Sequence, residues 1–221
     1  MKKITSLIIV FSMLVAMLAC FDVSTAFAAT NGNCGANFGG TNAKWSLNTS
    51  TGVLTISGKG ATKDCGNVGS NQAPWKDSRD KIKSIVVEDG ITALGRYMFY
   101  KCEVAESVSL PSTLTAIGDT KFLEYGTFVD CKALTNVTLP SKLQTIGHAA
   151  FKGCSSLKSI KIPDSVTTIG TSAFEDCKAL STVTFGTGVK VTGNMAFRNS
   201  GVSKVCLLYT SPSPRDGLLS R

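Results

Sequence analysis

Short apolar segments recur along the middle of the chain. Five β-prone tripeptides begin and end on an apolar residue, which is typical of a short strand with one buried face. They are Ile85–Val87, Val108–Leu110, Val137–Leu139, Ile160–Ile162 and Val183–Phe185. Four of them are followed by a second β-rich segment that ends in an apolar residue and a glycine, as in Ile146-Gly147. The pattern predicts two short strands in each repeat, and the glycine allows the chain to turn a corner.

These segments return with a period of 23 residues in the most regular part of the chain, where residues 135–157 and 158–180 agree at nearly every apolar, Gly, Pro and Cys position. A fixed period of this length marks a repeat architecture in which neighbouring repeats bury a common core. Each repeat also carries one phenylalanine, and parallel repeats place equivalent residues above one another. We therefore predict a short helical turn at this position and an internal column formed by Phe99, Phe128, Phe151, Phe174 and Phe197.

A different pattern precedes the repeats. Lys44–Leu47 and Val53–Ile56 alternate apolar and polar residues on either side of a turn-rich segment, which predicts a β-hairpin. The first repeat has no preceding neighbour to cover its apolar side, so a distinct cap is needed there. We expect the hairpin, together with Trp45 and Trp75, to form this cap.

The two ends of the chain have signatures of their own. Two lysines, an apolar run and Ala26-Phe27-Ala28 predict a secretory signal; the alternatives are a membrane anchor and lipid attachment at Cys20. Cys206–Asp216 resembles the translation of a transposase-type sequencing adapter, so we expect an assembly artefact there and a longer natural protein, with a Ser/Pro-rich linker as the alternative. The expected parts are a signal peptide at 1–28, a cap at 29–80, repeats at 81–205 and an unstructured tail at 206–221.

One repeat is longer than the others. Its interval between the corner glycine and the phenylalanine is ten residues instead of four, so six residues are inserted around Asp119–Glu124. Insertions in repeat proteins emerge as loops on one face, often the face that binds. Phe122 and Tyr125 are therefore candidate binding residues, and the alternative is that both aromatic rings fold back on the repeat.

Cysteines occur both in the repeats and before them. A set of four follows the phenylalanines by three residues, namely Cys102, Cys131, Cys154 and Cys177. A metal ladder or disulfides between repeats are the functional alternatives, but zinc sites need clustered pairs with histidines nearby. The pattern favours a column of small buried side chains. Cys34 and Cys65 lie in the expected cap of an exported protein. A disulfide between them and two free thiols are equally expected there.

Catalytic signatures are sparse. His148 is the one histidine of the chain and Cys154 follows it by six residues, so a Cys-His nucleophile pair needs consideration. However, His148 aligns with Arg96 and Thr171, a variable set typical of a solvent-facing position, and the cysteines equivalent to Cys154 lack any such partner. The chain also has no Gly-rich phosphate loop and no G-x-S-x-G motif. We expect no enzymatic activity, no cofactor and no metal.

The charge of the chain bears on its partners. The formal net charge is +8, and the lysines are scattered rather than clustered. This balance suits a soluble surface or weak attraction to acidic cell-wall and matrix polymers. It is not the dense basic stripe of a nucleic-acid binder, so nucleic acid is not an expected partner.

The repeat pattern L-x-x-I-x-I-P-x-x-V-x-x-I-G-x-x-A-F-x-x-C resembles the BspA-like class of leucine-rich repeats. Leu157–Cys177 matches it at every position, Leu134–Cys154 differs by conservative changes, and Lys81–Cys102 fits more loosely. The segments before the repeats resemble the hairpin cap of secreted bacterial members. The resemblance implies an α/β repeat solenoid, a right-handed coil with short parallel strands and short helical turns behind a β-hairpin cap.

The same resemblance implies an exported or surface-displayed recognition protein with an extracellular protein or glycan ligand, from host matrix or another cell surface. Strand side chains between two buried apolar residues point outward. Ser109, Thr138, Lys161 and Thr184 therefore form an exposed row that is either a binding face or a plain solvated face. The alternative function is a targeting region of a longer surface enzyme. The sequence leaves the oligomeric state open.

Overall fold

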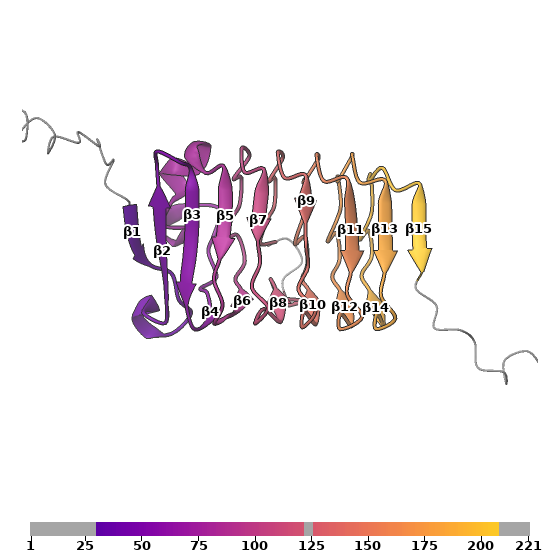
Figure 1. Ribbon diagram of the computed structural model, residues 1–221, viewed down its shortest axis with the longest axis horizontal. Helices are drawn as coiled ribbons and strands as arrows, with labels where there is room; N and C mark the ends of the chain where they lie inside the picture. The colour runs from indigo at the N-terminus through magenta and orange to yellow at the C-terminus, as the bar shows by residue number, and fades with distance from the viewer. Residues whose placement is uncertain (1–29, 122–125, 208–221) are drawn as a thin grey trace, which may run out of the picture.

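The computed structural model describes residues 30–121 and 126–207, and two β-sheets run along its length (Figure 1). The nine-stranded sheet has the order β1-β2-β3-β5-β7-β9-β11-β13-β15, and the six-stranded sheet has the order β14-β12-β10-β8-β6-β4. The strands of the larger sheet are β1 Thr30–Asn33, β2 Ala43–Asn48, β3 Val53–Gly58, β5 Ser84–Val87, β7 Ser107–Ser109, β9 Asn136–Val137, β11 Ser159–Ile162, β13 Thr182–Phe185 and β15 Lys204–Leu207.

The smaller sheet begins with a short strand from the chain before the repeats and then takes one from each repeat. Its strands are β4 Gly60–Ala61, β6 Ile91–Leu94, β8 Ala116–Ile117, β10 Thr145–Ile146, β12 Thr168–Ile169 and β14 Val191–Thr192. From β3 onward, neighbouring strands in both sheets pair in parallel. The predicted pair of strands per repeat is therefore confirmed, because each repeat adds one strand to each sheet.

The chain before the repeats is built differently. β2 and β3 pair antiparallel with Trp45 opposite Ile56, where the sequence predicts a hairpin, and β1 pairs antiparallel with β2. β3 then pairs in parallel with β5, the first strand of the repeats. Three short 3₁₀ helices belong to this part of the structure: η1 Phe38–Gly40, η2 Gly69–Asn71 and η3 Lys76–Lys81.

The predicted phenylalanine column is confirmed. Phe99, Phe128, Phe151 and Phe174 are fully buried, and successive ring centroids from Phe99 to Phe197 lie 4.9, 5.2, 5.4 and 5.2 Å apart in stacked orientation. Trp75 continues the column at its N-terminal end, 5.9 Å from Phe99. Offset stacking of large rings combines apolar burial with favourable ring geometry, so this column ties the repeats together.

The helical turns predicted around the phenylalanines are wrong. Within the described residues these segments are hydrogen-bonded turns that contain left-handed residues such as Ala149 (φ 50°) and Ser172 (φ 56°). Alternate backbone N–H groups donate to the next repeat, as Phe151 N does to Ala173 O at 2.8 Å. A helix would keep these N–H groups within one repeat, so pairing between repeats has replaced helical pairing.

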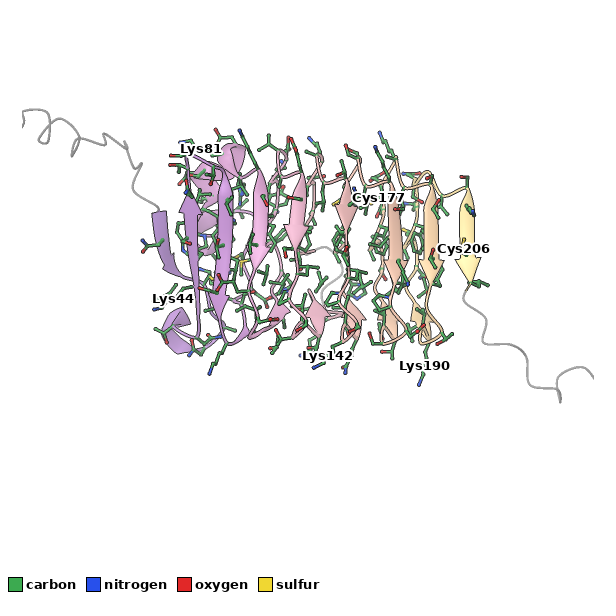
Figure 2. All side chains as sticks on the ribbon, in the orientation of Figure 1. Lys44, Lys81, Lys142, Cys177, Lys190 and Cys206 are labelled. Atoms are coloured by element: carbon green, nitrogen blue, oxygen red, sulfur yellow. The ribbon has the colours of Figure 1, made fainter. Side chains whose placement is uncertain are left out.

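The four repeat cysteines lie beside this column, as predicted for small buried side chains. All four are fully buried. The Sγ of Cys131, Cys154 and Cys177 donates to the carbonyl of the phenylalanine in the preceding repeat at 3.1–3.2 Å. Figure 2 shows Cys177 inside the body, whereas Lys142 and Lys190 project from its edge. These three thiols each donate a weak hydrogen bond while filling apolar space.

The tail predicted to be unstructured from residue 206 needs correction. β15 includes Cys206 and Leu207, which pair in parallel with Thr184 and Phe185 of β13. The physical reason is that β13 would otherwise present an open edge, and an extended segment such as Lys204–Leu207 satisfies its backbone groups. Residues 208–221 lie outside the described residues, as does the predicted signal peptide.

Candidate functional site

The row of outward-facing residues is present on the nine-stranded sheet. Ser109, Thr138 and Lys161 are exposed, and Thr184 is half-buried. Lys161 is in register with Thr184, and Ser109 is in register with Val86. Val86 in turn lies opposite Thr55 of the hairpin. The row therefore extends over the hairpin as well, and the sequence prediction missed Thr55 and Val86, although the same inside-outside alternation passes through both.

Pairing along this sheet is sparsest between β9 and β11. One residue pair, Ser159 with Asn136, is in register there, whereas β11 and β13 share four pairs. β9 ends at Val137 while β11 continues to Ile162, so the later part of β11 has no registered partner in β9. The repeat that precedes β9 is the one with the six-residue insertion.

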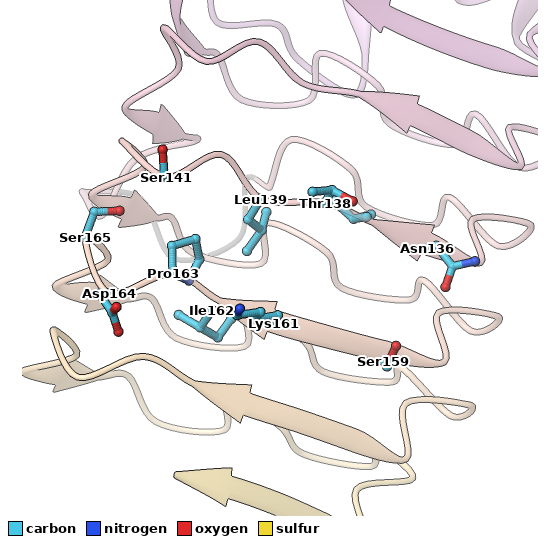
Figure 3. A pocket seen from close by; sticks show the side chains of 11 residues that line it. Asn136, Thr138, Leu139, Ser141, Ser159, Lys161, Ile162, Pro163, Asp164 and Ser165 are labelled. Carbon is cyan, nitrogen blue, oxygen red and sulfur yellow. The ribbon is translucent and has the colours of Figure 1, made fainter. Parts of the chain in front are cut away.

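A groove lies between the β9 and β11 segments, where the pairing is sparse (Figure 3). Its volume is about 770 Å³, and its lining residues are Asn136, Val137, Thr138, Leu139, Ser141, Ser159, Lys161, Ile162, Pro163, Asp164 and Ser165. The buried side chains of Val137, Leu139 and Ile162 supply apolar surface. In Figure 3, Asn136 and Ser159 lie at one end, and Ser141 and Ser165 lie at the other. An apolar base with a few polar groups around it is the usual composition of a ligand site.

Two charged groups line the groove, and their surroundings differ. Within residues 30–121 and 126–207, Lys161 has no ion-pair partner. The Asp164 carboxylate instead accepts hydrogen bonds from the backbone N–H of Thr187 at 2.8 Å and from its hydroxyl at 3.3 Å. The carboxylate is therefore occupied by the next repeat, while the ammonium group is available to a ligand.

The remaining predicted site residues have separate outcomes. Cys34 and Cys65 are both buried, and both are free thiols in the structure. A disulfide between them stays a prediction. Burial, together with the neighbouring Cys65, raises the pKa of Cys34 to about 12, and burial raises the pKa of Cys65 to about 11. Phe122 and Tyr125 lie outside the described residues.

The structure brings together no catalytic pair at His148. Its ring nitrogens contact Thr120 and Thr171, whereas the Cys154 thiol donates to Phe128 O. Burial raises the pKa of Cys154 well above its ordinary value, so this thiol is a poor source of thiolate. In the described part of the chain, no group of three or more His, Cys, Asp or Glu residues is placed to hold a metal ion.

Parallel strands that recur once per repeat in two sheets define a repeat protein with an open outer face. Six copies of the BspA type leucine-rich repeat region match residues 77–200. The chain therefore belongs to the BspA-type leucine-rich repeat family, which confirms the resemblance seen in its sequence.

Solved structures agree with this assignment. A leucine-rich repeat protein from Eubacterium ventriosum is 27% identical with a TM-score of 0.52, and the match covers 73% of this chain and 45% of that protein. The chain thus spans less than half the length of that relative. The T. pallidum leucine-rich repeat protein is 24% identical with a TM-score of 0.54, over 73% of this chain and 78% of that one, and shows the fold alone. No curated protein matches the sequence.

Across residues 30–121 and 126–207, no helix has the length and apolar character needed to cross a bilayer.

Proposed function

We propose that this chain is an exported, surface-displayed recognition protein without catalytic activity, which binds an extracellular protein or glycan in the groove between β9 and β11. The observation that carries the proposal is the single registered pair between β9 and β11, because a groove of about 770 Å³ lies where the two strands are not paired. Hydroxyl and amide groups, apolar surface and an ammonium group without an ion-pair partner among the described residues meet there, which suits a ligand with both apolar and anionic or hydrogen-bonding parts.

The proposal rests on a solenoid geometry for the described residues. In this arrangement the repeats form a right-handed coil, and the hairpin of β2 and β3 with Trp45 and Trp75 covers its N-terminal end. The edge-to-face contact of the two tryptophan rings at 5.5 Å and the stacking of Trp75 on Phe99 support this role. Such a scaffold holds the outer row at fixed spacing, which is how repeat proteins present extended binding faces.

Export is supported by the secretory pattern of residues 1–28. Under this proposal the ligand is a component of host matrix or of another cell surface.

Binding can be tested by presenting the full chain to a panel of purified matrix proteins and cell-surface glycans in a biosensor assay. Two groove variants are compared with the wild type, Lys161→Ala and Thr138→Ala. The matched control is Lys190→Ala, because Lys190 is also exposed but lies near β14 on the smaller sheet (Figure 2).

We expect at least one panel member to bind and Lys161→Ala to weaken it about tenfold or more, since a hydrogen bond to a charged group contributes about 1.5–3 kcal/mol. Lys190→Ala should leave the affinity unchanged. Failure of every panel member to bind would count against the recognition function, and equal losses in the two lysine variants would count against the groove.

A further inference from the structure

His148 connects three parts of the molecule through its two ring nitrogens and its backbone. Nε2 lies 2.8 Å from the carbonyl oxygen of Thr120, in the longer repeat. Nδ1 lies 2.7 Å from the backbone nitrogen of Thr171, in the following repeat. The backbone N–H of His148 donates to Asp119 O at 2.8 Å. The side chain therefore bridges the start of the insertion and the next corner of the chain.

These partners determine which form of the imidazole fits. A backbone N–H can only donate, so Nδ1 must accept from Thr171 and carries no proton. A carbonyl oxygen can only accept, so Nε2 must donate to Thr120. The arrangement is complete only for the neutral ring with its proton on Nε2. A protonated ring has two donors, and its Nδ1–H would face the Thr171 N–H.

An equivalent corner earlier in the chain uses a different acceptor. There the backbone N–H of Arg96 donates to Asp64 Oδ1 at 2.9 Å. In both corners a side chain from earlier in the sequence accepts the backbone N–H of the residue that follows the corner glycine. A carboxylate oxygen keeps a lone pair for this bond, whereas an imidazole nitrogen loses its acceptor capacity when it takes up a proton. Protonation of the side chain therefore affects the two corners differently.

The charged groups next to this histidine belong to the longer repeat and the preceding corner. Asp119 pairs with Arg96 (Nε to Oδ2, 3.5 Å), and its Oδ1 accepts from the Lys121 N–H at 3.0 Å. The Thr171 corner contributes hydroxyl groups from Thr171 and Ser172 and no charge.

We propose that His148 is a pH-sensitive latch, which fastens Thr120 to the Thr171 corner when neutral and releases both when protonated. Protonation removes the acceptor of the Thr171 N–H, and the ring must turn away from that N–H, which also breaks its bond to Thr120. The other bonds between these repeats, such as Gly170 N to Ile146 O at 2.8 Å, do not involve the ring. Release is therefore local, and the stacked repeats remain folded.

The chain is suited to a direct test because it contains a single histidine. Long-range ¹H–¹⁵N NMR of the full chain at pH 7.5 should show a proton on Nε2 and an unprotonated Nδ1. Hydrogen exchange, corrected for the intrinsic pH dependence of exchange, should show the protection of the Thr171 amide falling about fivefold to tenfold at pH 5.0, the loss corresponding to one neutral hydrogen bond.

The matched variant is His148→Asn, whose side-chain oxygen can take the place of Nδ1 as an acceptor without titrating in this range. Its Thr171 amide should keep the same protection at both pH values. A proton on Nδ1 at pH 7.5, constant Thr171 protection in the wild type, or an equal loss in His148→Asn would each overturn the latch. None of these outcomes depends on ligand binding in the groove.

Discussion

The interior phenylalanine column and the outer ladder of the nine-stranded sheet are built from the same repeats but differ in regularity. The column keeps ring spacings of 4.9–5.4 Å from Phe99 to Phe197. The outer ladder passes from four registered pairs between β11 and β13 to one pair between β9 and β11. The column continues without change through the repeats where the ladder opens.

This difference shows which contacts fix the position of each repeat. Interior rings are close-packed on both sides, and any displacement would leave a cavity. Strand pairs on the outer face are solvated on one side, so a local loss of pairing can be offset by water. The interior can therefore maintain the stack while the outer face varies, and variation on that face is what produces a groove.

The largest expected effect comes from breaking the column in its middle. Phe151→Ala should lower the free energy of unfolding by about 3–5 kcal/mol, because it removes a fully buried ring and leaves a cavity. Phe197→Ala, at the half-buried end of the column, should cost about 1–2 kcal/mol. Both values can be measured by urea denaturation, and equal costs would contradict the cooperative column.

A second change tests the tightness of the corners. A Cβ on Gly170 would lie 2.5 Å from the backbone nitrogen of His148, so Gly170→Ala should cost about 1–3 kcal/mol through overpacking. Gly66→Ala is the control, because the nearest atom there would be at 3.5 Å, an ordinary contact. Similar melting temperatures for the two variants would show that the corners have room to adjust.

Acid should weaken an ion cluster on the turn side of the stack. Glu175 is 2% exposed, with Arg198 Nε at 2.8 Å and Lys152 Nζ at 3.3 Å. Burial by itself raises the pKa of this carboxyl, but hydrogen bonds from Ser172, Arg198 and Lys152 outweigh burial and hold the pKa below its ordinary value. Its stabilisation is therefore fully present above about pH 4.3 and is lost as the pH falls through the lowered folded-state pKa.

The variant Glu175→Gln isolates this contribution. It should cost about 1 kcal/mol at pH 7, a modest value because Arg198 and Lys152 are half-exposed and can turn to solvent. Unfolding free energies measured from pH 7 to pH 3 should converge for the variant and the wild type at the acid end. A constant gap over this range would rule out the ion cluster as the cause.

The smallest effect on stability is expected in the groove itself. Lys161→Ala should change the free energy of unfolding by less than about 0.5 kcal/mol, because the side chain is exposed and has no ion-pair partner within the described residues. Thermal denaturation is sufficient to measure it. A cost comparable to that of Phe197→Ala would mean that the groove stabilises the fold and is not free to serve a ligand.

The sequence predicted the interior better than the outer face, and the reason is physical. A 23-residue period places Phe151 above Phe128 whatever the local turn, so the column follows from spacing alone. The turn itself was predicted to be helical because its local propensity does not reveal hydrogen bonds to the next repeat. The groove could not be predicted from the sequence, because Val137–Leu139 has the same apolar-polar-apolar pattern as Ile160–Ile162. The loss of pairing depends on how the two strands are placed relative to each other in space.

The most direct measurement of the recognition claim is hydrogen exchange of the full chain with and without a ligand identified from the biosensor panel. Ligand binding in the groove should slow exchange in residues 136–141 and 159–165, which line it, and leave the smaller sheet at β10 and β12 unchanged. Slower exchange on the smaller sheet with no change in these two segments would contradict the proposal.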